Sequence, residues 1–265
     1  MTDVLLSALY RYPVKSCRGA RLDAAMLDRY GIAGDRHWML VEAASGRFVT
    51  QRQHARMALI DTQWHGDTLG LSVAGAGGVE VTSGIGEPRT VEVWGEVVQA
   101  LDAGDEAAAW LSEYLGLAVR LVECGPAHRR PVDPAYDRIG AETGFSDGFP
   151  LLLISEASLA DLNSRMERPV EMIRFRPNLV VSGCAPFAED GWKRLRIGGI
   201  ELHVVKPCSR CPIPTIDPAT AARGREPMAT LLKYRREGQK TYFGQNLIHA
   251  GPGELQAGMR VEVLE

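Results

Sequence analysis

Short apolar segments separated by turn-forming residues dominate the first hundred residues of the chain. Segments rich in Val, Leu, Tyr and Trp span residues 4–14, 36–43, 67–73, 79–83 and 90–101. Such segments are typical of β-strands. The Gly-rich stretches 74–78 and 83–87 are turns, not phosphate-binding loops, because no amphipathic helix follows either. Since no helix separates these strands, we expect an antiparallel barrel or a strongly bent sheet.

Helical periodicity first appears in residues 104–116. Acidic residues lie in its first turn, Ala108, Leu111 and Leu115 share one face, and Gly116 is the predicted stop. Two more helices are predicted, one over 155–166, where Ser155 can cap the first turn, and one over 226–237.

Further strands alternate with these helices in the second half of the chain. They are predicted over residues 149–154, 177–183, 200–207, 242–251 and 259–265. Gly198 and Gly199 predict a hairpin turn before the third of them.

The region 124–148 separates two β-rich parts of the chain. It is rich in Pro, Gly, Arg and Asp and has no apolar periodicity. We therefore predict an α+β, β-rich protein with domains at residues 1–123 and 124–265. The first is expected to be β-barrel-like, and the second a β-barrel with a few peripheral helices.

Composition indicates a soluble globular protein and excludes several function classes. Hydrophobic residues make up 45% and charged residues 24% of the 265 residues, and the net charge is −3. This balance argues against a nucleic-acid duplex or a membrane surface as the main partner. No signal peptide and no stretch of about eighteen apolar residues is evident. The five scattered cysteines do not resemble a secreted disulfide framework, so a cytoplasmic location is expected.

The sequence CSRC places Cys208 and Cys211 at C-x-x-C spacing. A zinc site would need four ligands, and no second pair lies nearby. A thioredoxin-like dithiol begins a helix, whereas Pro212 and Pro214 favour an extended chain here. Two interpretations remain open: both cysteines are small buried residues, or one thiolate serves as a soft metal ligand. The neighbouring Arg210 would favour the deprotonated form of such a thiolate.

Three segments carry groups suited to binding an anion. Lys15 and Ser16 follow a strand, Arg36 lies in GDRHW, and Arg176 and Asn178 lie in RFRPN. Any one arginine alone is more often a solvated surface charge. The run 128–130, His-Arg-Arg, is likewise interpreted as a solvated loop, and the tryptophans at 38, 64 and 94 as core residues.

The chain resembles the MOSC family, named for the C-terminal domain of molybdenum cofactor sulfurase, in the branch of the mitochondrial amidoxime-reducing component. YPVKSCRG and GDRHWMLV are similar to that branch's N-terminal β-barrel domain. LLLISEASLADLN, FRPNLVVSG, CSRCPIPTIDPATA and FGQNLI are similar to successive blocks of the MOSC domain. The resemblance therefore covers almost the whole chain, and implies that residues 1–123 and 124–265 are these two domains.

The resemblance also implies a cofactor and a set of residues that hold it. The cofactor is a molybdenum–molybdopterin, and the second cysteine of the block, Cys211, is both its metal ligand and the catalytic residue, with Cys208 supporting or incidental. The residues expected to bind the cofactor are Lys15, Ser16, Arg36, Asp147, Gly148, Phe149, Arg176, Asn178, Arg210, Cys211, Gly244, Gln245 and Asn246.

The activity implied by the family is the reduction of N-hydroxylated compounds, such as amidoximes, hydroxylamines and N-hydroxylated bases, by two-electron removal of oxygen at molybdenum. The alternative is a pterin or sulfur carrier that reduces no substrate. Some relatives append an iron–sulfur module, which needs four closely placed cysteines that this chain lacks. We therefore expect a separate electron donor of the ferredoxin, flavoprotein reductase or cytochrome b5 type.

Overall fold

The largest sheet of the protein is built from both ends of the chain. In the computed structural model, which describes residues 3–265, its strands are β1 (Leu5–Arg11), β2 (Ala20–Leu22), β12 (Leu151–Ser155), β13 (Leu179–Ser182), β14 (Arg194–Ile197), β15 (Ile200–Ser209), β16 (Arg236–Glu237), β17 (Lys240–His249) and β19 (Val261–Val263). Eight of them follow the order β19-β14-β15-β17-β12-β13-β1-β2, and β16 pairs with β17. Leu and Ile side chains from these strands form one apolar core.

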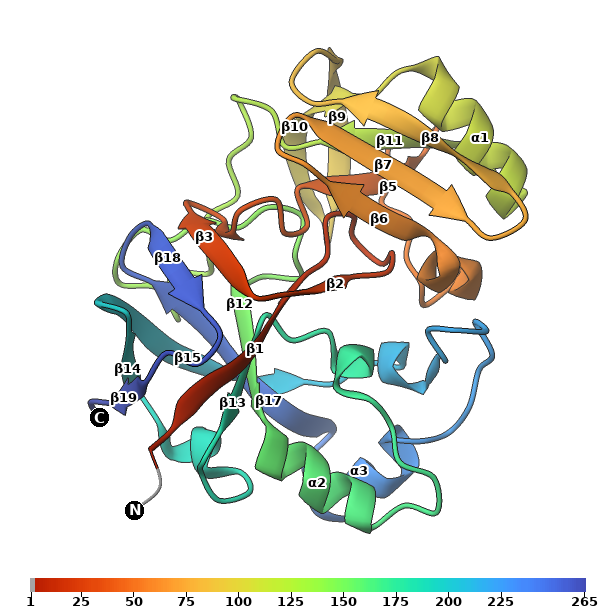
Figure 1. Ribbon diagram of the computed structural model, residues 1–265. Coiled ribbons are helices and arrows are strands. Elements are labelled where there is room, and N and C mark those ends of the chain that lie inside the picture. The colour runs from red at the N-terminus through yellow and green to blue at the C-terminus, as the bar shows by residue number, and fades with distance from the viewer. Residues whose placement is uncertain (1–2) are drawn as a thin grey trace.

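The N-terminal half adds two smaller sheets, which lie at the top of Figure 1. Their strands are β5 (Trp38–Glu42), β6 (Asp61–Trp64), β7 (Thr68–Val73), β8 (Gly77–Thr82), β9 (Glu87–Val93), β10 (Glu96–Asp102) and β11 (Val119–Glu123). They pair in the orders β5-β11-β10-β9 and β6-β7-β8. The helix α1 (Asp105–Leu115) packs Leu111 into the core between the two sheets. It ends at Gly116, the predicted stop, whose φ of 67° is in the left-handed region.

The two halves are joined by strand pairing across the predicted boundary. β1 pairs antiparallel with β13, and β3 (Ala24–Asp28) pairs with both β4 (Gly31–Ile32) and β18 (Gly253–Gln256). Figure 1 shows β1 running through the C-terminal half and β3 beside β18. A division between residues 123 and 124 therefore does not separate two independent sets of sheets.

The helices of the C-terminal half are short, as expected for a β-rich protein. α2 (Glu156–Ser164) begins at Ser155, whose Oγ accepts a hydrogen bond from the Ser158 amide at 3.0 Å, so the predicted cap is confirmed. Residues 3–265 also contain four 3-10 turns, one in the N-terminal half, η1 (Ala55–Leu59), and three in the C-terminal half, η2 (Met172–Phe175), η3 (Ala188–Gly191) and η4 (Ile213–Thr215). None of the helices within residues 3–265 is long and apolar enough to span a membrane.

The helix predicted over 226–237 is wrong in its length. α3 covers only Met228–Tyr234, and Arg236–Glu237 instead forms the short strand β16 against β17. Gly238, with φ of 59°, lies in the turn between these strands and allows the chain to reverse. The Gly198–Gly199 hairpin is confirmed, since both glycines have positive φ and β14 pairs with β15 directly around them.

Candidate functional site

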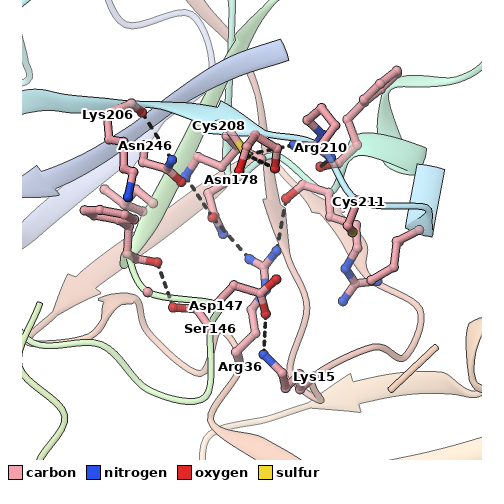
Figure 2. A pocket seen from close by; sticks show the side chains of 18 of the residues that line it. Lys15, Arg36, Ser146, Asp147, Asn178, Lys206, Cys208, Arg210, Cys211 and Asn246 are labelled. Atoms are coloured by element: carbon pink, nitrogen blue, oxygen red, sulfur yellow. Dashed lines mark hydrogen bonds and ion pairs between the residues drawn. The ribbon is translucent and has the colours of Figure 1, made fainter. Parts of the chain in front are cut away.

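A cavity of about 410 Å³ opens where loops of the two halves meet. It contains most of the residues singled out from the sequence, and Figure 2 shows several of them directed toward one another. The predicted residues that line it are Lys15, Ser16, Arg36, Asp147, Gly148, Phe149, Arg176, Asn178, Arg210, Cys211 and Asn246. Segments more than 190 residues apart in the chain, from Lys15 to Cys211, thus share one site.

Gly244 and Gln245 do not line this cavity, so their grouping with it is corrected. The Gln245 side chain is buried and donates a hydrogen bond to Asp190 at 2.7 Å. Gly244 packs so closely that an added Cβ would lie 2.6 Å from Ile154 Cγ1. Strand alternation explains the difference between Gln245 and Asn246, because adjacent residues of β17 point to opposite faces and Asn246 reaches the cavity.

The cavity lining carries a large excess of positive charge. Lys15, Arg36, Arg52, Arg176, Lys206 and Arg210 line it, against one carboxylate, Asp147. A cavity with this balance favours an anionic ligand such as a phosphate.

Lys15 and Asp147 form the centre of an ion-pair network on one wall. Lys15 Nζ lies 2.5 Å from Asp147 Oδ1 and donates to the Phe145 carbonyl at 2.7 Å. Arg52 Nη2 and Trp94 Nε1 reach the same carboxylate, at 2.9 and 3.2 Å. Burial lowers the pKa of Lys15 to about 8, although Asp147 acts in the opposite direction.

Tyr12 holds two of the cationic groups in place. The guanidinium carbons of Arg36 and Arg176 lie 4.3 and 4.2 Å from the centre of its fully buried ring. Arg36 also donates to Asn178 Oδ1 at 3.1 Å, and Arg176 Nη1 donates to the Cys17 carbonyl at 2.6 Å. Burial, together with the charge of Arg36, lowers the pKa of Arg176 to about 10. Arg176 Nη2 is buried without a hydrogen-bond partner among residues 3–265.

Strained backbone concentrates around the cavity. Ser16, Arg36, Trp94 and Arg176 have φ of 69°, 44°, 55° and 56°, in the left-handed region that residues with a Cβ rarely occupy. They are four of the six non-glycine residues with positive φ in the described part of the chain. Such conformations persist where the surrounding structure enforces them, and they are frequent at functional sites.

The Cys208–Cys211 segment begins near the end of β15 and ends shortly before η4. Both cysteines are half-buried and line the cavity, so the interpretation of both as buried core residues is wrong. The predicted extended conformation holds only as far as the end of β15, because the prolines that follow form the 3-10 turn η4. No α-helix begins at either cysteine, which leaves the dithiol without the helix dipole that activates thioredoxin-like sites.

The two sulfurs have different guanidinium partners. Arg210 Nη1 donates to Cys208 Sγ at 3.1 Å, and Arg210 Nη2 donates to the Phe175 carbonyl at 2.8 Å. Arg210 was expected to act on the metal-binding thiol, Cys211, but its hydrogen bond goes to Cys208 instead. The Cys211 thiol instead interacts with Arg52, which also holds Asp147.

Sequence reasoning missed two of the residues in this network. Arg52 follows no recognisable motif, and Trp94 was expected in the core, yet its side chain is 45% exposed at the cavity. Trp94 precedes Gly95 in the turn between β9 and β10, and this Trp-Gly pair was the available signal.

The loop that carries Asp147 accepts hydrogen bonds from a buried arginine. Arg130 is only 2% exposed and donates to the Gly144 and Ser146 carbonyls, and it forms a 3.2 Å ion pair with Glu96. His128 is also fully buried. The interpretation of this run as a solvated loop is therefore wrong for His128 and Arg130, which are buried, whereas Arg129 is exposed as expected.

Family models match both halves of the chain. Residues 4–118 match the MOSC N-terminal beta barrel domain, and residues 141–262 match the MOSC domain. The chain belongs to the MOSC family. Mitochondrial amidoxime-reducing component 1 of mouse and of human are each 38% identical to it over 98% of this chain and 82% of their own length.

A longer relative also matches this MOSC protein almost from end to end. Molybdenum cofactor sulfurase of rice is 32% identical over 99% of this chain, which spans about a third (35%) of the rice protein.

The donor groups of this MOSC cavity fit a pterin-bound metal. No group of three or more His, Cys, Asp or Glu within residues 3–265 could hold a metal ion. The Cys211 thiol is a soft donor that would contribute one ligand to a metal held mainly by a cofactor. Arg176 Nη2 and Arg210 Nε are buried and have no hydrogen-bond partner among the described residues, so both are donors available for anionic groups. Space is open where a Cβ would stand at Gly148, so backbone there is accessible to a ligand.

Proposed function

We propose that this MOSC protein reduces N-hydroxylated compounds with molybdenum bound through a molybdopterin cofactor. The observation that carries the proposal is the half-buried Cys211 thiol in a cavity whose lining has six cationic side chains and one carboxylate. The amidoxime-reducing components named above, at 38% identity, supply the reaction class.

Each residue of the cavity has a role in this proposal. Cys211, which interacts with Arg52, binds the metal. Arg36 and Arg176, held by Tyr12, donate to the phosphate and pterin, and Ser16 adds a hydroxyl. When bound, the cofactor supplies two-electron oxygen-atom chemistry.

The reaction has a definite balance of atoms and charge. An amidoxime takes up two electrons and two protons, its N–O bond breaks, and the products are an amidine and water. We propose that a separate protein of the ferredoxin, flavoprotein reductase or cytochrome b5 type supplies the electrons, and that the reaction takes place in the cytoplasm. Asp147 lies on the Lys15 wall, where it can orient a substrate N–H or N–OH group.

The matched variants Cys211→Ala and Cys208→Ala test this proposal, because both remove a half-buried thiol from the same segment. The proteins are purified from a molybdate-supplemented host that loads a control molybdoenzyme. We expect about one molybdenum and one pterin per chain, and reduction of benzamidoxime with reduced methyl viologen, in the wild type and in Cys208→Ala. Cys211→Ala should lose the metal and the activity. A fully active Cys211→Ala protein would refute the assignment.

The carrier alternative is favoured by one observation, the end-to-end match to rice molybdenum cofactor sulfurase. A sulfur carrier would hold a persulfide on Cys211 and no lasting metal. Mass spectrometry of the intact protein and elemental analysis separate the two. A persulfide at Cys211 without stoichiometric molybdenum would favour the carrier.

A further inference from the structure

Lys206 differs from the other five cations that line the cavity. Lys15 and Arg52 share Asp147, Arg36 pairs with Asp35, and the remaining two arginines donate to backbone carbonyls. Within residues 3–265, no carboxylate or hydrogen-bond acceptor contacts Lys206 Nζ. Its charge is therefore not neutralised by the protein and acts on whatever occupies the cavity.

Two aromatic rings hold Lys206 in position. Its Nζ lies 4.1 Å from the centre of the Tyr136 ring and 5.7 Å from that of Phe149, which itself lines the cavity. The two rings contact each other edge to face, with centres 5.8 Å apart. Asn246 Nδ2 donates to the Lys206 carbonyl at 3.1 Å and fixes its backbone. Figure 2 shows Lys206 on the side of the cavity away from Cys211.

The proposed reaction changes the charge of the ligand. An amidoxime is a weak base and is neutral at pH 7, as is a hydroxylamine. The amidine or alkylamine formed by removal of the oxygen is a strong base and takes up a further proton, which makes it a cation. A bound phosphate carries about −1.5 to −2 charges, which leaves the lining of six cations and one carboxylate net positive.

We propose that Lys206, held by Tyr136 and Phe149, makes the cavity selective for neutral N-hydroxylated substrates and expels their cationic products. This role rests on the proposed function. Like charges in a partly dehydrated cavity repel, so a protonated amidine binds more weakly than a neutral ligand of the same shape. Neutral or anionic N-hydroxylated compounds are then the substrate class, and permanently cationic ones are excluded.

Binding of benzamidine and benzamide to the loaded protein tests the proposal. These ligands have similar shape, and only benzamidine is cationic at pH 7. Their dissociation constants are measured by titration calorimetry for the wild type, Lys206→Met, Lys206→Arg and Lys193→Met. Lys193→Met is the matched control, because that side chain is 70% exposed and pairs with Glu265 instead of facing the cavity. Molybdenum and pterin contents are measured on the same samples.

We expect Lys206→Met to bind benzamidine at least about fivefold more tightly than the wild type at low salt, with benzamide unchanged. Lys206→Arg and Lys193→Met should match the wild type, and the gain should shrink at high ionic strength. Equal benzamidine affinities in the wild type and Lys206→Met would overturn the proposed charge selectivity. Loss of cofactor from Lys206→Met would also overturn it, because Lys206 would then be a cofactor ligand. If the loaded wild type reduces no N-hydroxylated compound, the proposed function itself fails.

Discussion

Replacement of Lys15 by Met should stabilise the protein at neutral pH, although Lys15 belongs to the candidate site. The Lys15 side chain is 5% exposed, and burial lowers its pKa from 10.5 to about 8 even with Asp147 at 2.5 Å. A protonated Lys15 is thus held in an unfavourable environment. Met keeps most of the apolar stem and removes the charge, and Asp147 retains Arg52 and Trp94 as partners.

The size of the effect follows from the pKa difference. The fall from 10.5 to about 8 corresponds to about 3 kcal/mol of folding free energy lost while Lys15 is charged. Met also leaves the Phe145 carbonyl without its donor, at a cost of about 1–2 kcal/mol. The net stabilisation expected at pH 7 is therefore about 1–2 kcal/mol.

The dependence on pH gives the prediction its sharpest test. Below pH 8 Lys15 is protonated in both the folded and unfolded states, and the full penalty applies. Between pH 8 and 10.5 the folded state loses this proton first, so wild-type stability rises relative to the variant by at most about 1.4 kcal/mol per pH unit. Urea unfolding of both proteins at pH 7 to 11 should show the advantage of Lys15→Met shrink and then reverse. A variant that is less stable than the wild type at pH 7, or a difference that does not change with pH, would refute the reasoning.

Two further predictions concern the scaffold around the site. Gly244→Ala should lower stability by about 2–4 kcal/mol, because the new Cβ would lie 2.6 Å from Ile154 Cγ1 and the φ of 83° disfavours a side chain. The control Gly238→Ala has a φ of 59° but open space around its Cβ, so it should lower stability by about 1 kcal/mol. Equal losses in urea unfolding would contradict the steric argument. Ser155→Ala should lower stability by about 1–2 kcal/mol, since the Ser158 amide loses its 3.0 Å acceptor, and an unchanged melting temperature would show that the cap is dispensable.

The secondary structure was predictable where local chemistry decides it. Segments rich in Val, Leu, Tyr and Trp located β1, β5, β7, β8, β12, β13, β15, β17 and β19, Gly116 ended α1, and Ser155 capped α2. The segment predicted over 90–101 is two strands, β9 and β10, joined by a turn, and the strands β2, β3, β4, β6, β11, β14, β16 and β18 were not predicted. The third helix was overestimated because Gly238 lies just beyond the predicted end, and the residues before it pair with β17 instead of continuing the helix. Pairing of β1 with β13 was not predictable, because these strands lie far apart in sequence and no local pattern specifies a partner.

The candidate site was predictable only where motifs exist. Lys15, Arg36, Arg176 and Cys211 were named from short sequence blocks, and the structure brings all four to one cavity. Arg52, Trp94 and Lys206 were missed, because each reaches the cavity through tertiary packing. The left-handed backbone at Trp94 is imposed by the β9–β10 turn, for which the Trp94-Gly95 pair was the available signal.

Because strands of the two halves pair with each other, this pairing determines which part of the protein can be produced or transferred on its own. The segment 141–262 carries Cys211, but produced alone it would lack β1, leave the edge of β13 unpaired and remove the core side chains Leu6 and Leu9. Such an open edge invites association with other chains. Transfer of the cysteine block to another protein therefore requires both halves together. The rice sulfurase, which is nearly three times as long, aligns with 99% of this chain and so matches both halves in sequence.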